Sequence, residues 1–359
     1  MPIRLELRTV PSKVMGILSP LIAILGTLAF GFVLFALLGK PPIAVFNALL
    51  IQPLSTMYGV TELLAKAAPL VLIATGLALC FRGKVWNIGA EGQFTIGAIV
   101  GGGLALGFQT VESPWILVPI LLAGCLGGAV WSAIPALLRS HFNTNELLTS
   151  LMLNYVALSL LNYLVQGPWR NPQGYNFPET VQFSSFASLP MLVWGTRIHL
   201  GVIFAVIAAI AIWFLLTRTF FGFQVRVMGA SVATAEYAGF SFSRMIWTSL
   251  PISGALAGLA GVCEVTGPIG QLRPSISPGY GYAAIIAAFI GRLNPLGIIF
   301  SSLLLALLYI GGEMAQISLG LPSALSGIFQ GTLLFFLLAT DILMLYRVKW
   351  QSPKLNQSS

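Results

Sequence analysis

A row of polar side chains interrupts one apolar stretch of the sequence and could hydrogen-bond a solute. Within 146–166, the spacing i, i+4, i+7, i+11 puts on one helical face Tyr155, Ser159, Asn162 and Gln166. Hydroxyl and amide groups in this arrangement suit an uncharged polar solute, and polar side chains among apolar neighbours face a bundle interior or water. The alternative is that the row makes hydrogen bonds between helices.

A second polar segment opens the apolar stretch after Arg82. It places a carboxylate and two amides between glycines, in the run Trp86-Asn87-Ile88-Gly89-Ala90-Glu91-Gly92-Gln93-Phe94. If this run is helical, Asn87, Glu91 and Thr95 share one face. A carboxylate here is either partnered or faces water, which predicts a structured turn at the cytoplasmic mouth of a pathway. The alternative is a plain helix start, with Glu91 favouring the positive N-terminal end.

A short polar stretch between two apolar stretches carries the signals of a separate helix. Ser231 is a candidate N-cap and Gly239 suits the position after the helix, which predicts a helix over 231–238. Its faces are mostly alanine, and a helix this short does not persist alone in water. We therefore expect it to dock in a groove of a cytoplasmic subunit. The alternative is a connector that lies on the surface.

Several kinds of chemistry lack the residues that they need. No HExxH and no GxxxxGK[ST] motif occurs, so we expect no metal, no cofactor and no phosphate-binding loop in this chain. Cys80, Cys125 and Cys263 lie inside apolar stretches, without the spacing of a zinc site or a disulfide framework. No nucleophile constellation indicates an enzyme. No basic stripe indicates binding of nucleic acid.

The elements that position these residues are built for lipid. Of 359 residues, 57% are hydrophobic and 8% charged, whereas soluble domains carry about 25% charged residues. A helix needs about 20 apolar residues to cross the hydrocarbon. The sequence therefore predicts an all-α membrane protein with about ten transmembrane helices, at 16–38, 63–81, 86–108, 115–138, 146–166, 199–217, 245–266, 280–291, 296–312 and 322–345.

The basic residues indicate the orientation. If the N-terminus is inside, thirteen of the eighteen Lys and Arg residues fall on the inner side and five on the outer side, which is the pattern of cytoplasmic loops. The net charge of +8 follows from this pattern. We expect a cytoplasmic segment 1–15, a transmembrane domain 16–345 with an inner loop 218–244, and a cytoplasmic tail 346–359.

One predicted span is too short for a simple crossing. Residues 280–291 follow Pro278 and Gly279 and cover only about 20 Å at about 1.5 Å per residue. This predicts a short broken or re-entrant helix, and the alternative is a tilted helix in thinned lipid. Glycine-rich segments at 87–103 and 277–297 and two halves of five spans permit an inverted repeat.

Four GxxxG pairs lie in the predicted spans. This spacing lets two helix backbones approach closely. We expect helix packing rather than chemistry from Gly97/Gly101, Gly103/Gly107, Gly124/Gly128 and Gly254/Gly258.

Three longer motifs stand out once the spans are placed: Asn87-Ile88-Gly89-Ala90-Glu91-Gly92-Gln93, Asn145-Glu146-Leu147-Leu148-Thr149-Ser150-Leu151-Met152-Leu153-Asn154-Tyr155, and Gly167-Pro168-Trp169-Arg170. Over roughly residues 60–345 the chain resembles the permease subunits of bacterial ABC importers for nucleosides. These belong to the wider ribose-type and branched-chain amino-acid-type permease superfamily. Trp86 stands where the family typically has Phe, and Leu147 where it has a β-branched aliphatic residue.

The resemblance implies an importer subunit with no chemistry of its own, in the cytoplasmic membrane of a bacterium. The implied partners are an ABC ATPase, a second homologous permease in a heterodimer, and an external binding protein that delivers a nucleoside. ATPase coupling would fall on Gly229, Ala230, Ala233, Glu236 and Gly239. The pathway residues would be Asn87, Glu91, Gln93, Asn154, Tyr155, Ser159, Asn162 and Gln166.

Other classes of function stay open at this point. An ion-coupled secondary transporter would need ionisable residues at mid-span, whereas most acids of this chain lie near span ends or in loops. A membrane enzyme or an assembly scaffold is the other class, and a scaffold would need no motif. Within the importer class, sugars and vitamins are alternative solutes.

Overall fold

The computed structural model describes residues 3–7, 13–322 and 324–350 of the chain. Its contacts divide the chain into a larger unit, residues 54–310, and a smaller unit made of 1–53 and 311–359. Each unit brings together helices that carry mostly apolar side chains, as expected for a protein embedded in lipid.

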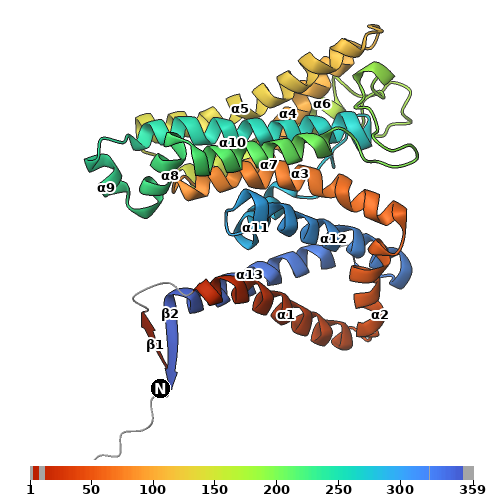
Figure 1. The fold of residues 1–359 in the computed structure, drawn as a ribbon. Coiled ribbons are helices and arrows are strands. Elements are labelled where there is room, and N and C mark those ends of the chain that lie inside the picture. The colour runs from red at the N-terminus through yellow and green to blue at the C-terminus, as the bar shows by residue number, and fades with distance from the viewer. Residues whose placement is uncertain (1–2, 8–12, 323, 351–359) are drawn as a thin grey trace, which may run out of the picture. The chain divides into compact units, whose positions relative to one another are not determined.

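The larger unit is a bundle of long helices with short helices at one end. In chain order it contains α3 (Met57–Arg82), α4 (Ala90–Gly107), α5 (Leu117–Phe142), α6 (Glu146–Gln166), α7 (Gly201–Arg218), α8 (Phe220–Ala230), α9 (Val232–Tyr237), α10 (Phe242–Glu264), α11 (Tyr280–Ile290) and the first part of α12 (Pro295–Leu319). Figure 1 shows α8 and α9 at one end of α7 and α10, and the loop 167–198 at the other end. We call these ends the α9 end and the loop end.

The smaller unit packs the first helix against the last. It contains α1 (Lys13–Leu37), α2 (Pro42–Phe46) and α13 (Leu325–Leu345). The ring of Phe35 lies 5.5 Å from the rings of both Phe46 and Phe329, centroid to centroid. Strands β1 (Ile3–Leu7) and β2 (Tyr346–Trp350) pair antiparallel, so the two described ends of the chain lie together.

The helical membrane fold is confirmed, and each predicted span contains one helix. Within the described residues, however, seven helices rather than ten are long and apolar enough to cross a membrane; α4, α11 and α13 are not among them. The eleven residues of α11 extend only about 16 Å at about 1.5 Å per residue. The prediction of a short helix at 280–291 is therefore confirmed. The β1–β2 ribbon was not predicted.

Glycines let α4, α5 and α10 approach closely, as three of the four predicted pairs require. A Cβ on Gly128 would lie 2.7 Å from the Cα of Gly258, and Gly97 also contacts Gly258. The pair Gly103/Gly107 is an exception. Gly103 faces the ring of Trp169, and Gly107 has no neighbour within 4 Å of its Cβ position. This packing holds α10 in the middle of the bundle.

Candidate functional site

Polar side chains from several parts of the larger unit meet halfway along its helices. We call this cluster the polar junction, and it comprises Asn87, Glu91, Gln93, Asn154, Ser253 and Ser277. Asn87 donates from Nδ2 to Ser253 Oγ at 3.0 Å. Ser253 lies near the middle of the apolar stretch Phe242–Ile269. The junction therefore lies at mid-depth of the bundle.

Glu91 lies in the first turn of α4, and its carboxylate reaches the N-terminus of α11. Its Oε2 accepts a hydrogen bond from the N–H of Gly281 at 2.6 Å, and Ser277 bonds to the same carboxyl group. A Cβ on Gly281 would lie 2.6 Å from the Cα of Glu91, so this approach requires glycine. The carboxyl group thereby satisfies one of the free N–H groups at the start of α11.

The position of Glu91 differs from the expectation for the acids of this chain. The sequence places it near the start of the predicted span 86–108, but α4 begins halfway through the bundle, and only 3% of the Glu91 surface is exposed. The helix-start interpretation is right about the first turn of α4. It does not include the contact of Glu91 with α11, because Glu91 and Gly281 are 190 positions apart in the sequence.

The predicted helical face that begins at Asn87 does not form. The helix begins at Ala90, four residues later than the predicted span, and the chain is irregular over 85–88. Asn87 Oδ1 accepts a hydrogen bond from the N–H of Gly89 at 3.0 Å, and its amide pairs with the amide of Gln93 through two bonds of 3.0 Å. These local bonds compete with helix formation and hold the turn.

Asn154 joins α6 to the beginnings of α4 and α11. Its Oδ1 accepts a hydrogen bond from the N–H of Gly92 at 2.8 Å. Its Nδ2 donates to the carbonyl of Ile88 at 2.9 Å and to the hydroxyl of Tyr282 at 3.2 Å. The Asn154 side chain is fully buried. One amide thus joins the irregular run before α4 to the first turns of α4 and α11.

The polar row of α6 keeps its single face, but this face points out of the unit. Tyr155 is 60% exposed, Ser159 and Gln166 are exposed, and Asn162 is half-buried. The structure thus separates the eight pathway candidates into a buried group in the polar junction and an open row on α6. Tyr282 is 39% exposed and bonds to Asn154, so it lies where the two groups meet.

Four polar residues of this region were not among the expected site residues: Ser150, Ser253, Ser277 and Tyr282. Ser150 Oγ accepts a hydrogen bond from the N–H of Ile88 at 3.2 Å. Apart from Ser150, which follows Thr149, each is a single polar side chain among apolar or glycine neighbours, and such a residue is a weak signal without knowledge of its partners. Among the residues that the structure describes, no group of three or more His, Cys, Asp or Glu could hold a metal ion.

The predicted helix between the apolar stretches is confirmed as α9, with both of its caps. Ser231 is the N-cap, and its hydroxyl accepts a hydrogen bond from the N–H of Thr234 at 3.2 Å. At the other end, the N–H groups of Gly239 and Phe240 donate to the carbonyls of Glu236 and Ala235, which forms a Schellman motif. Gly239 has φ +83°, where glycine is favoured.

The surface around α9 carries small side chains together with Glu236 and Tyr237. Ala230, Ala233, Glu236 and Gly239 are exposed, while Ala235 packs inward. Gly229 differs, because its Cβ position directly contacts the carbonyl of Arg82 at the end of α3. Of the five coupling candidates, four therefore lie on the surface around α9, and Gly229 fixes that surface to the bundle.

A further helix, α8, comes just before α9 and is not among the helices predicted from the sequence. Thr219 caps it by accepting a hydrogen bond from the N–H of Gly222 at 3.1 Å. Gly222, Val225 and Met228 are buried at intervals of three residues. The N-cap Thr219 and the apolar positions spaced by three residues are a sequence signal for α8. The signal is weak because the helix is short and its apolar content resembles that of the adjoining span.

At the loop end, the segment 167–198 is tied to the chain that follows α10. Its backbone N–H groups donate over 2.8–3.0 Å in the pairs Thr180→Leu272, Phe183→Gly270 and Leu189→Thr266. Arg197 donates to the carbonyl of Pro268 at 3.1 Å and lies 3.6 Å from the carboxylate of Glu62 on α3. The long loop is therefore an ordered cover of this end.

His199 is buried beneath this cover. Its Nδ1 accepts a hydrogen bond from the N–H of Gly201 at 3.0 Å, its ring contacts Gly267, and only 2% of its surface is exposed. Burial, helped by the positive charge of Arg197, lowers the pKa of His199 to about 4. The ordinary pKa of histidine is about 6.5. The folded protein therefore holds this ring neutral.

We expect the contribution of His199 to the stability of the loop end to be lost as the pH falls from about 6.5 to about 4. In this window the unfolded chain binds a proton at His199 and the folded chain does not, so acid favours unfolding. The cost is a few kcal/mol at about 1.4 kcal/mol per pH unit.

Hydrogen exchange of residues 180–200 at several pH values measures this loss of stability. His199→Gln should flatten this pH dependence, and His141→Gln, at an exposed site, should retain it. Equal pH dependences of exchange in the two variants would contradict the assignment of this effect to His199.

Comparison with known proteins shows similarity along almost the whole chain. The family described as branched-chain amino acid transport system / permease component matches residues 59–338. The glucose ABC transporter permease protein TsgB13 of Haloferax volcanii is 35% identical over 95% of this chain and 92% of its own length. The guanosine ABC transporter permease protein NupP of Bacillus subtilis is 30% identical over 95% of this chain and 97% of its own length. The nucleoside ABC transporter permease protein NupB of Lactococcus lactis is 27% identical over 97% of this chain and 98% of its own length. No solved structure matches.

Proposed function

We propose that this chain, which belongs to the branched-chain amino acid transport system / permease component family, moves nucleosides across the membrane. The chain is a multi-pass ABC transporter permease and not an enzyme. Transporters of this kind work with an ATPase and with a binding protein, so ATP hydrolysis takes place in another subunit. The proposal concerns the solute, the pathway, the second permease and the orientation.

The pathway follows the open polar row of α6, with the polar junction as its support at mid-depth. Tyr155, Ser159, Asn162 and Gln166 offer hydroxyl and amide groups with no charge. Tyr282 adds a second partly exposed ring beside them. An exposed polar row within a membrane needs a polar or aqueous neighbour. We therefore place the row against a second homologous permease, with the solute passing between the two chains.

The observation that carries the choice of solute is the combination of tyrosine rings with amides and hydroxyls. A nucleobase can stack on an aromatic ring, which contributes about 1–3 kcal/mol per base in other proteins. The amides and hydroxyls can bond the ribose. The relatives named for guanosine and nucleosides support this solute. A sugar is the second candidate, favoured by the relative named for glucose.

Uptake by the complete transporter distinguishes the two solutes. We expect unlabelled guanosine, and not glucose, to compete with radiolabelled guanosine, and calorimetry should show the same preference in the cognate binding protein. Tyr155→Ala should lower nucleoside uptake about tenfold through lost stacking. Tyr163→Ala, an exposed tyrosine of α6 outside the row, is the matched control. Competition by glucose alone would replace the nucleoside proposal with the sugar proposal.

The coupling surface is α9 with its flanks: Gly229, Ala230, Ala233, Glu236 and Gly239. We place the α9 end in the cytoplasm, where the ATPase works, and the loop end outside. The basic residues concentrate on the same side as α9 under this orientation. Pairing of β1 with β2 supports both termini lying on one side, which we take as the cytoplasmic side.

Cysteine labelling in intact cells tests this orientation. Tyr237 on α9 is 96% exposed and Trp194 in the loop 167–198 is 99% exposed. We expect a membrane-impermeant maleimide to label Trp194→Cys in intact cells, and Tyr237→Cys only after permeabilisation. Cys80 and Cys263 are buried and Cys125 is half-buried, so background labelling is measured on the chain without either substitution. Labelling of Tyr237→Cys from outside would overturn both the orientation and the assignment of α9 to coupling.

A further inference from the structure

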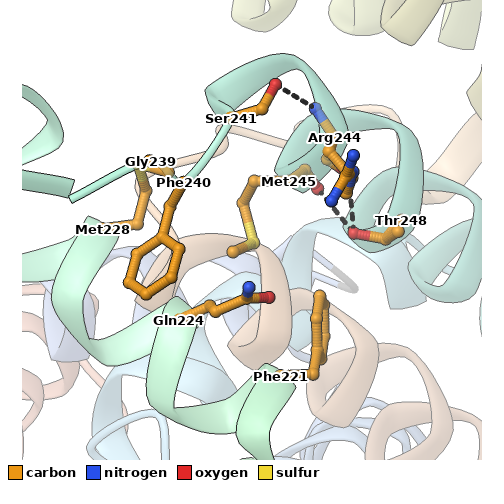
Figure 2. A pocket seen from close by; sticks show the side chains of 9 residues that line it. All are labelled: Phe221, Gln224, Met228, Gly239, Phe240, Ser241, Arg244, Met245 and Thr248. Atoms are coloured by element: carbon orange, nitrogen blue, oxygen red, sulfur yellow. Dashed lines mark hydrogen bonds between the residues drawn. The ribbon is translucent and has the colours of Figure 1, made fainter. Parts of the chain in front are cut away.

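A small pocket opens beside α9 and has no role in the proposals above. It lies between α8 and the first two turns of α10, and the turn Gly239–Phe240 closes one side (Figure 2). Its volume is about 60 Å³. A water-sized group needs about 10–15 Å³ on this measure, so the pocket admits about four such groups. That is the size of a leucine or methionine side chain. We call it the α8–α10 pocket.

The inside of the α8–α10 pocket is apolar and adaptable. Met228 and Met245 are 0% and 3% exposed and form its inner surface. Figure 2 shows the Met245 sulfur between the rings of Phe221 and Phe240. Phe240 is itself held by edge-to-face contacts with Phe220 and Phe223. Methionine adjusts its shape to a bound group, so these walls suit an apolar side chain.

The rim of the pocket is polar and carries one positive charge. Gln224, Ser241, Arg244 and Thr248 surround the opening. Arg244 is exposed, and the structure shows no acidic partner for its guanidinium among the described residues. The whole segment 218–244 has three arginines and only one acid, Glu236. A partner that covers this surface is therefore complementary if it is acidic.

The position of the pocket connects it to the bundle. Arg244, Met245 and Thr248 belong to the first turns of α10, the helix that packs by glycines on α4 and α5. Ser241 caps this helix by accepting a hydrogen bond from the N–H of Arg244 at 3.3 Å. Gly239 both ends α9 and closes the pocket. A side chain in the pocket would thus act directly on α10.

We propose that the α8–α10 pocket receives an apolar side chain of the ATPase subunit, with a neighbouring carboxylate of that subunit paired to Arg244. This inference rests on the proposed function, because it assumes that the α9 end meets the ATPase. The contact is then reciprocal. The ATPase holds α9 in its own groove and inserts a side chain beneath it. If the ATPase only pressed on α9, it could transmit only a movement toward the permease. A side chain held in the pocket also transmits a movement of the ATPase away from the permease to α10.

Photo-crosslinking in the assembled transporter tests the contact. p-Benzoyl-phenylalanine replaces Gln224 at the pocket rim in one variant and Glu236 on α9 in another, and mass spectrometry identifies the products. We expect both positions to crosslink to the ATPase. A crosslink from position 236 but not from 224, or only lipid adducts at 224, would overturn the pocket inference and leave the proposed function standing. No crosslink to an ATPase from either position would overturn both.

Charge reversal supplies a second readout. Arg244→Glu should weaken binding of the purified ATPase to the permease in nanodiscs about tenfold, as expected for loss of one important ion pair. Arg218→Glu is the matched control, because Arg218 is also exposed in this segment but does not line the pocket. An acid-to-Lys substitution at the crosslinked ATPase site should restore binding to Arg244→Glu alone. Equal losses in the two arginine variants, or no rescue, would contradict the inference.

Discussion

Solute uptake will fall about 100-fold while ATP hydrolysis continues when Glu236→Trp and Gly239→Leu are combined, which corresponds to loss of an interface contact of about 3 kcal/mol. Glu236 is exposed, so its replacement costs the isolated chain little. At Gly239, φ is +83° and no atom lies within 4 Å of the Cβ position. A leucine there strains the backbone by about 1–2 kcal/mol and adds bulk beside α9, where Gly239 borders the α8–α10 pocket. Both changes keep the ATPase from seating on α9.

Reconstituted vesicles that contain the complete transporter allow uptake and ATP hydrolysis to be measured together. Gly195→Leu is the matched control for strain, because Gly195 has φ +76°, equally open surroundings, and a place in the loop 167–198. The control should transport normally. If the double variant also transports normally, the assignment of α9 to coupling is wrong. If Gly195→Leu fails as well, backbone strain rather than docking explains the loss.

Replacing Glu91 will have the second large effect, and the two replacements will separate its roles. Glu91→Leu leaves the N–H of Gly281 and the hydroxyl of Ser277 without their acceptor in a buried site. A buried donor left without an acceptor costs about 1–3 kcal/mol, so we expect reduced thermal stability and no uptake. Glu91→Gln keeps an acceptor oxygen for the N–H of Gly281. The expected loss is therefore smaller, about 0.5–1.5 kcal/mol for one altered hydrogen bond.

Thermal unfolding of the purified variants in nanodiscs, followed by uptake in vesicles, measures both effects. Glu112→Leu is the control, since Glu112 is an exposed acid between α4 and α5. We expect the order of stability Glu112→Leu, then Glu91→Gln, then Glu91→Leu. A Glu91→Leu variant as stable as the control would show that the carboxylate does not hold α11 in place.

Some local features were predictable from neighbouring residues. Ser231 and Gly239 bounded α9 correctly because capping hydrogen bonds join residues three to five positions apart. The short helix at 280–291 was predictable because Pro278 and Gly279 precede an apolar run that is too short to span. The same local logic failed at Asn87. Its side chain bonds to Gly89 and Gln93 and delays the start of α4, whereas hydropathy alone continues the span.

By itself the sequence determined the membrane class, the succession of helices and the capped helix α9, because lipid burial and caps depend on composition and on close neighbours. Only the tertiary structure decided that the polar residues divide into a buried junction and an open row. That division depends on Glu91 meeting Gly281 and on Asn154 meeting Tyr282, contacts that join residues 190 and 128 positions apart. Such contacts exist only after the helices have packed, because the depth at which α4 and α11 begin sets which polar groups meet.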